Sequence, residues 1–215
     1  MTDRWALALR GLDVTRATIV AHSLSSSLVL RMAARHPELV GAIVSLEGGM
    51  VERFETPGLR AAAAMAPLIR AFGASGIVRR RVRSSLRDRS ANTRWVTREV
   101  VDVYSRPLVR NMDRSLALLR ALSEAREPVS IADQARTVRA PVLLLLGDAK
   151  QSAGPGHDEI DRMRGALASF SVDTIANAGH FLHEEQPAAV VRRILQLDRK
   201  SRLSPSTTGS DPTPE

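Results

Sequence analysis

The sequence predicts an α/β fold in which about four mostly parallel strands alternate with flanking helices. Three short apolar runs carry this prediction, at residues 17–22, 40–46 and 141–147, with helical patterns between them. Runs of continuous apolar character are typical of parallel strands that helices cover on both faces. With 215 residues, 44% of them hydrophobic, the chain can bury one core, or one core and a small lid.

The first 50 residues predict a helix, a strand, a helix and a strand, in that order. Residues 3–11 are the end of a helix that a C-terminal glycine closes. A strand follows at 17–22, and then a helix over 24–36. This helix ends before Pro37, because proline disfavours helical geometry in the residue that precedes it. The run at 40–46 is the second buried strand.

Residues 51–127 have a different character. They form arginine- and alanine-rich helical stretches that proline and glycine interrupt, with no strand pattern. We therefore expect a helical insertion here.

After the insertion, strands and helices alternate again. The sequence predicts a strand at 141–147, an amphipathic helix over 158–170, a strand at 171–176 and a final helix from Pro187 to about Leu197. Residues 201–215 are rich in serine, threonine, proline and glycine, and we expect a disordered tail.

Composition excludes several classes of function. The chain has no cysteine, which excludes disulfides, thiol catalysis and cysteine metal sites. No signal segment and no apolar run of about 20 residues is present, so we expect a cytoplasmic protein without a membrane span. The net charge of +8 comes from dispersed arginine, and aromatic residues are only 3%, so we expect no nucleic-acid partner. The arginine cluster over 79–89 is interpreted as a solvated helix face, or less favourably as a patch for anionic substrates.

A serine at the end of the first strand is the first candidate catalytic residue. Ser23 directly follows the run 17–22, and a helical pattern begins at once. This is the strand, sharp turn and helix of a nucleophile elbow, and it would place the Leu24 amide where an oxyanion forms. Ala21 and Ser25 stand where the elbow motif usually has glycine. Taken alone, the same serine could also be a helix cap.

A histidine near the end of the fold is the second candidate. His180 follows Gly179 in the loop after the strand at 171–176, shortly before Pro187. A histidine there can reach a serine at the end of another strand, as a general base must. Taken alone, it could be an ordinary loop histidine.

In this order, the motifs resemble the α/β-hydrolase superfamily over residues 1–198. The elbow at 21–25 (Ala-His-Ser-Leu-Ser) and the segment at 178–187 (Ala-Gly-His-Phe-Leu-His-Glu-Glu-Gln-Pro) carry the resemblance. The family places the nucleophile before the acid and the acid before the histidine. His22 and His183 are interpreted as structural.

The resemblance also gives a domain organisation. The helical stretch 51–127 is similar to the family's cap, which closes over the active site and shapes substrate choice. Residues 1–50 would then be core with the elbow, residues 128–200 core with the acid and histidine segments, and residues 201–215 the tail.

The acid is ambiguous. The family usually has Gly-x-x-Asp after the strand that follows the cap, but Lys150 stands at that position here. Asp148 is close to it in sequence, and Glu47 ends the strand after the elbow helix, from which some family members take their acid. Both strand ends lie at the same edge of a parallel sheet, so either carboxylate could orient His180. Glu47 is favoured over Asp148.

The resemblance further implies that the chain is N-terminally truncated and contains the C-terminal half of the family's fold. Several strands normally precede the elbow strand, with a loop that supplies a second oxyanion donor, but only 16 residues precede Ala17. Strand 17–22 would then be an apolar edge that a partner chain or a second copy covers, and the Leu24 amide would be the remaining donor. Three explanations stay open: a start upstream of Met1, a weakly active relic, or a partner that completes the sheet.

The sequence therefore predicts a serine hydrolase that acts on a small ester, lactone, amide or related carbonyl compound without metal or cofactor. Ser23 would attack, His180 would transfer the proton, Glu47 or Asp148 would orient the imidazole, and Leu24 would bind the oxyanion. The alternative is an inactive or weakly active relic, or an interaction module, of the same fold.

Overall fold

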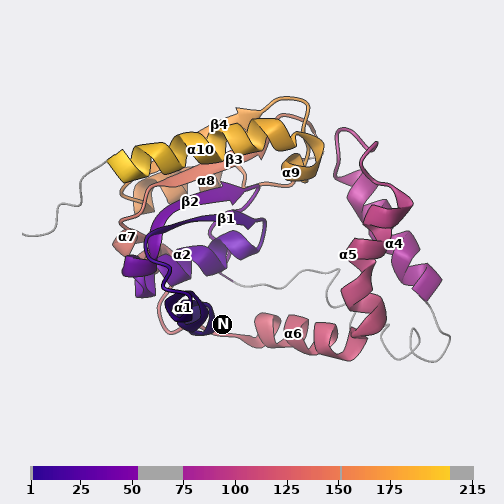
Figure 1. Cartoon of the computed structure of the whole chain (residues 1–215), viewed down its shortest axis with the longest axis horizontal. Helices are drawn as coiled ribbons and strands as arrows, with labels where there is room; N and C mark the ends of the chain where they lie inside the picture. The colour runs from indigo at the N-terminus through magenta and orange to yellow at the C-terminus, as the bar shows by residue number, and fades with distance from the viewer. Residues whose placement is uncertain (1, 53–74, 151, 204–215) are drawn as a thin grey trace, which may run out of the picture.

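A four-stranded, fully parallel sheet forms the centre of the computed structural model, which describes residues 2–52, 75–150 and 152–203 (Figure 1). The strands are adjacent in chain order: β1 (Ala17–His22), β2 (Val40–Leu46), β3 (Val142–Gly147) and β4 (Phe170–Ile175). The predicted α/β fold with about four parallel strands is confirmed.

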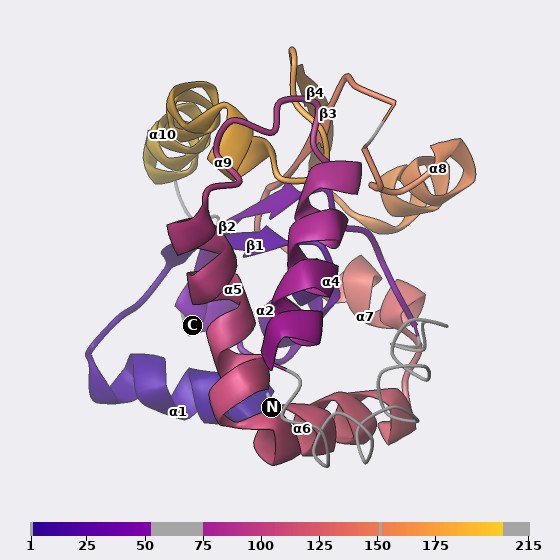
Figure 2. The ribbon, with the colours of Figure 1, turned by 90° about the vertical axis from the view of Figure 1, so that its right-hand side faces the viewer.

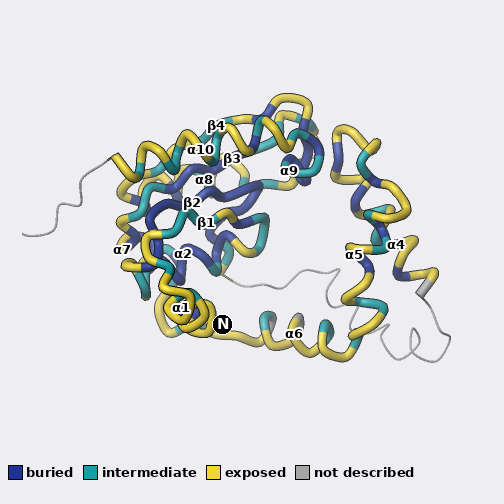
Figure 3. The backbone as a smooth tube through the Cα atoms, viewed as in Figure 1, coloured by how far each residue is buried: buried dark blue, intermediate teal, exposed yellow. Residues whose placement is uncertain are grey.

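Helices cover both faces of this sheet. They are α1 (Thr2–Gly11), α2 (Ser25–Arg35), the short 3-10 helix η1 (Pro37–Leu39), α7 (Ile131–Thr137), α8 (His157–Ala166), α9 (Leu182–Glu185) and α10 (Pro187–Leu203). One apolar cluster joins the sheet to α2, α7 and α8, and a second joins it to α9 and α10. Along β3, Val142 and Leu144 belong to the first cluster, whereas Leu143 and Leu145 belong to the second. Burial on both faces explains the continuous apolar runs of β2 and β3. Figure 3 shows β2 buried along its length, and residues 142–145 of β3 are buried as well.

Two predicted boundaries are wrong. The helix predicted over 158–170 ends at Ala166, because Leu167 turns to extended backbone and Phe170 already pairs with Val142 as the first residue of β4. Phe170 packs against the same apolar cluster as the helix. The apolar spacing of the segment therefore predicts which residues are buried, but not that Phe170 belongs to a strand. The final helix continues to Leu203, three residues into the predicted tail; residues 204–215 lie outside the described residues.

The described part of the predicted insertion is helical. It contains α4 (Ser75–Asp88), α5 (Arg98–Arg110) and α6 (Met112–Glu124), whereas residues 53–74 lie outside the described residues. Helices α4 and α5 stand beyond the carboxyl ends of the strands, as two perpendicular views agree (Figures 1 and 2). That position is the one expected of a cap, and the assignment as a cap stays a prediction.

Strand β1 is an edge of the sheet. In the part of the chain that the structure describes, it pairs with β2 on one side only, and Val20 is 42% exposed. A groove of about 550 Å³ runs along this edge, between β1 and residues of α1 and α2 that include Trp5 and Met32. That a partner chain or second copy covers β1 stays a prediction. Within the described part of the chain, no helix combines the length and apolar character that crossing a bilayer requires.

The carboxyl end of β3 lies so close to the loop after β4 that only glycine fits. A Cβ atom at Gly147 would lie 2.2 Å from the Ala178 carbonyl oxygen. We expect Gly147→Ala to lower the free energy of unfolding by about 2 kcal/mol, because backbone must move to admit the methyl group. Urea unfolding measures this. Gly156→Ala is the matched control, since a Cβ there meets nothing within 4 Å; an equal loss in both variants would contradict the prediction.

Candidate active site

Ser23 occupies a strained turn between β1 and α2. Its φ of 53° lies in the left-handed region, which costs a residue other than glycine about 1–3 kcal/mol. The Ser23 amide donates to the Leu46 carbonyl over 2.8 Å, so β2 fixes the turn. Leu24, not Ser23, is the N-cap residue of α2, and its side chain makes no capping hydrogen bond. Within the described residues, the Ser23 hydroxyl makes no capping hydrogen bond, and the Leu24 amide lies at a helix N-terminus, which favours negative charge.

A glycine on the neighbouring strand end lets the elbow pack closely. A Cβ at Gly48 would lie 2.1 Å from Ser26 Oγ and 2.4 Å from the Ser23 carbonyl oxygen. Ser45 Oγ lies 2.7 Å from both Ser26 Oγ and the Gly48 carbonyl oxygen. The residue before Gly48, Glu47, is thereby held beside the elbow.

Glu47 and His180 come together at the carboxyl edge of the sheet. Glu47 follows β2 with a φ of 51°, and His180 lies in the loop after β4. Their side chains are almost fully buried, and His180 Nδ1 lies 3.4 Å from Glu47 Oε2. The two residues are 133 positions apart in the chain, so only the folded sheet unites them.

Backbone amides and a serine hydroxyl surround the Glu47 carboxylate in addition to the histidine. Oε1 accepts from the Gly147 amide at 2.6 Å, Oε2 accepts from the Ala153 amide at 3.0 Å, and Ser152 Oγ lies 2.8 and 2.7 Å from the two oxygens. Burial raises the pKa of Glu47, but hydrogen bonds from His180, the Gly147 amide and Ser152 outweigh it. The net result is a pKa below the ordinary value. Glu47 is an ionised carboxylate at neutral pH.

Asp148, the other candidate acid, serves a different turn. Its side chain is exposed, and Oδ1 accepts from the amide of Asn177, whose φ is 57°. Within the described residues it makes no hydrogen bond or ion pair with His180. The structure therefore places Glu47, and not Asp148, beside the histidine.

No hydrogen bond joins the predicted nucleophile and base within the described residues. Within the described residues, the Ser23 hydroxyl makes no hydrogen bond with His180, and Ser23 is half-buried. Catalytic hydrogen bonds are commonly long in ligand-free enzymes and shorten when substrate binds.

The segment after α4 contacts the loop that carries His180. The His180 amide donates to the carbonyl of Arg89, the residue that follows α4. Tyr104 of α5 donates to Glu184 at 2.6 Å in the same region.

His22 supports the histidine loop. Its Nε2 lies 2.9 Å from the His180 carbonyl oxygen, and its ring centroid lies 4.7 Å from that of His180 and 4.6 Å from that of His183. Burial lowers the pKa of His22 to about 4, although the hydrogen bond to His180 opposes this shift, so the ring is neutral at pH 7 and Nε2–H donates. Burial also lowers the pKa of His183, whose buried Nδ1 has no hydrogen-bond partner among the described residues. These contacts agree with the structural role predicted for both.

The depressed pKa of His22 gives a pH dependence of stability. Between pH 6.5 and 4 the unfolded chain binds the proton that folded His22 excludes, so the free energy of unfolding falls as pH decreases through this range. A shift from 6.5 to about 4 corresponds to at most about 3 kcal/mol. Urea unfolding at pH 7 and pH 4.5 measures the loss, which His22→Asn should reduce. His157→Asn, at an exposed site, is the control; a wild-type pH dependence in His22→Asn would contradict the prediction.

Ser152 is a site residue that sequence analysis missed, because a serine in a loop after a strand carries no recognisable pattern. Its hydroxyl lies within hydrogen-bond distance of both oxygens of Glu47, so in a catalytic site it would act as a positioning residue. We expect Ser152→Ala to lower kcat about tenfold with little change in KM, since it removes a hydrogen bond to a charged group. Ser152→Thr should restore most of the rate because it keeps the hydroxyl. Steady-state kinetics measure both; a change confined to KM would contradict this role.

No metal site accompanies this arrangement in the described ranges 2–52, 75–150 and 152–203, where no three histidine, aspartate or glutamate side chains are grouped to hold an ion. The candidate chemistry is carried by the hydroxyl, the imidazole and the carboxylate.

The described features are those of an α/β hydrolase. They are a parallel sheet, a serine turn after one strand, a buried acid at the end of the next strand, and a histidine after the last strand. The sequence profile of the Alpha/beta hydrolase family matches residues 2–193, and the chain belongs to this family.

Individual relatives match less extensively. A 65-residue segment is 34% identical to the uncharacterized carboxylesterase nap of Bacillus subtilis (strain 168); it covers 30% of this chain and 21% of that protein, about a fifth of its length. The crystal structure of wild-type Cfl2 from Burkholderia cenocepacia is similar with a TM-score of 0.72 and 23% identity, over 91% of this chain and 69% of that chain. The ligand-free epoxide hydrolase CorEH is similar with a TM-score of 0.74 and 18% identity, over 93% and 74%. At these identities the structural likeness shows the fold alone.

Proposed function

We propose that the chain is a serine hydrolase that acts on a small ester, lactone, amide or related carbonyl compound. The observation that supports this most strongly is the buried His180–Glu47 contact at the same sheet edge as the strained Ser23 turn. The matched segment of a protein named as a carboxylesterase agrees with this reaction class.

In the proposed mechanism, Ser23 Oγ attacks the substrate carbonyl carbon while His180 Nε2 accepts the hydroxyl proton. Glu47 holds the Nδ1–H side of the imidazole and stabilises the imidazolium that forms. The Leu24 amide donates to the oxyanion of the tetrahedral intermediate. His180 then returns the proton to the leaving group, and a water molecule activated by the same imidazole hydrolyses the acyl-enzyme.

A serine nucleophile separates this proposal from epoxide hydrolysis. That reaction uses a carboxylate, which forms an alkyl ester with the opened epoxide, whereas a serine hydroxyl at the elbow suits attack on a carbonyl. The fold likeness to an epoxide hydrolase does not transfer its chemistry.

A fluorophosphonate probe tests the proposal, because it phosphonylates an activated serine hydroxyl. Intact-mass spectrometry of the folded chain should show one adduct, and peptide mapping should locate it on Ser23. Folded protein that gains no adduct would overturn the proposal. It would favour the second candidate, an inactive or weakly active relic or interaction module, which the unpaired edge of β1 supports.

A further inference from the structure

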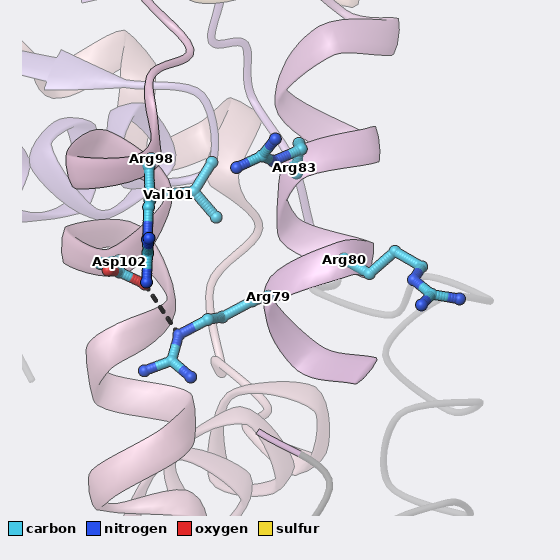
Figure 4. A pocket seen from close by; sticks show the side chains of 6 residues that line it. All are labelled: Arg79, Arg80, Arg83, Arg98, Val101 and Asp102. Atoms are coloured by element: carbon cyan, nitrogen blue, oxygen red, sulfur yellow. Dashed lines mark ion pairs between the residues drawn. The ribbon is translucent and has the colours of Figure 1, made fainter. Parts of the chain in front are cut away.

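An arginine-lined groove lies between α4 and α5, outside the Ser23–His180–Glu47 site. Its volume is about 430 Å³ (Figure 4). The lining residues are Arg79, Arg80, Arg83, Arg98, Val101 and Asp102.

The positive charge of this groove is only partly compensated. Arg79 Nε lies 2.7 Å from Asp102 Oδ1, and this ion pair is about half exposed. Within the described residues, Arg83 and Arg98 form no ion pair. The lining of the groove thus contains four arginines and a single carboxylate, that of Asp102.

The arrangement is electrostatically unfavourable when no ligand is bound. Arg79 and Arg83 are one helical turn apart on α4, where like charges repel. Arg98 is the first residue of α5, where the positive end of the helix dipole disfavours a cation. An anion between the helices would relieve both interactions.

The side chains are oriented for such an anion. In Figure 4, Arg79 and Arg83 extend from α4 toward α5, and Arg98 lies along the facing side of α5. Arg80 extends away from the gap between the helices. Guanidinium groups donate paired N–H bonds that match the oxygens of carboxylate and phosphate.

The floor of the groove leads toward the candidate active site. Val101 is 2% exposed and belongs to the apolar cluster that contains Phe181. The Phe181 ring lies 5.2 Å from the His180 ring, centroid to centroid. The apolar cluster that contains Val101 therefore includes the residue next to His180.

We propose that the α4–α5 groove is a binding site for the carboxylate or phosphate group of a small organic anion, with Arg83 and Arg98 as its principal ligands. This goes beyond the proposed hydrolase activity and does not depend on it. Of the two interpretations of the arginine cluster at 79–89, the groove favours the patch for anions.

Isothermal titration of the full chain with succinate and, separately, with inorganic phosphate tests this proposal. Sodium chloride keeps the ionic strength constant, so that general screening does not contribute. We expect saturable binding of at least one probe, weakened about tenfold or more in Arg83→Gln and in Arg98→Gln. Arg80→Gln is the matched control, because it removes the same charge from the same helix but from a side chain that points away. Circular dichroism and Tm verify that each variant is folded.

Each outcome of the titrations either supports the anion site or contradicts it. Binding of succinate alone assigns a carboxylate ligand, and binding of phosphate alone assigns a phosphate ligand; both support the site. Absence of saturable binding, or equal weakening by Arg80→Gln, overturns it. A duplex DNA probe covers the remaining alternative. If all three variants weaken DNA binding equally while neither small anion binds, the surface is a diffuse polyanion contact and the proposal is wrong.

Discussion

Replacement of Ser23 by alanine is expected to abolish fluorophosphonate labelling and to lower ester hydrolysis by about 10³-fold or more. Without the hydroxyl no acyl-enzyme can form, and only binding and the Leu24 amide remain to assist attack by water. Intact-mass spectrometry and a p-nitrophenyl ester assay measure the two effects.

Ser25→Ala is the matched control for this experiment. Ser25 is an exposed serine two positions further along, at the start of α2, and its replacement should leave labelling intact. Ser23→Gly adds a second readout, because glycine adopts a φ of 53° without strain. We expect it to be inactive but more stable than Ser23→Ala, by about 1 kcal/mol in urea unfolding. Adduct formation in Ser23→Ala would place the nucleophile elsewhere.

The second large effect is expected from the acid. Glu47→Gln should lower kcat by about 10³–10⁴-fold, because the amide keeps the size of the side chain but not the charge that stabilises the imidazolium. Asp148→Asn should change kcat less than about threefold, since Asp148 is exposed and bonded to the Asn177 amide instead.

Circular dichroism spectra that match the wild type exclude a folding defect in both variants. Pre-steady-state kinetics with an activated ester then measure the effect on the chemical step. In Glu47→Gln, burial of an uncharged amide among donors that served a carboxylate will also cost stability, so each variant is assayed well below its Tm. The assignment of Glu47 as the acid would be wrong if Asp148→Asn suppressed turnover and Glu47→Gln preserved it.

Much of the fold follows from local sequence signals. The runs at 17–22, 40–46 and 141–147 became β1, β2 and β3 within one residue. The runs of β2 and β3 are apolar because helices cover these strands on both faces, whereas the short β-branched and apolar run at 17–22 forms the edge strand. The segment 158–170 shows the limit of this reasoning. Phe170 continues the apolar period of α8, yet it pairs with Val142 as a strand residue, because an available neighbouring strand outweighs helical periodicity.

Some residues of the candidate site could be predicted from the sequence, and others could not. The Ser23 turn could be predicted because its determinants, a strand, small residues and a helix, are contiguous in the chain. Ser152 could not, because its role exists only where the loop after β3 meets the end of β2. The arginine groove is intermediate: the cluster was visible in the sequence, but the orientation of Arg83 toward α5 and of Arg80 away from it was not.

The sequence by itself thus determined the α/β class, the order of the motifs and the identity of Ser23 and His180 as candidates, because each depends on residues close together in the chain. The choice between Glu47 and Asp148 as neighbour of His180 was left to the tertiary structure. Both carboxylates follow strands that end at the same sheet edge, so their spacing in sequence cannot distinguish them. The loop carrying His180 lies against Gly147 at the end of β3, and the hydrogen bonds of Gly147, Ser152 and Ala153 turn Glu47 inward, while Asp148 turns outward to Asn177.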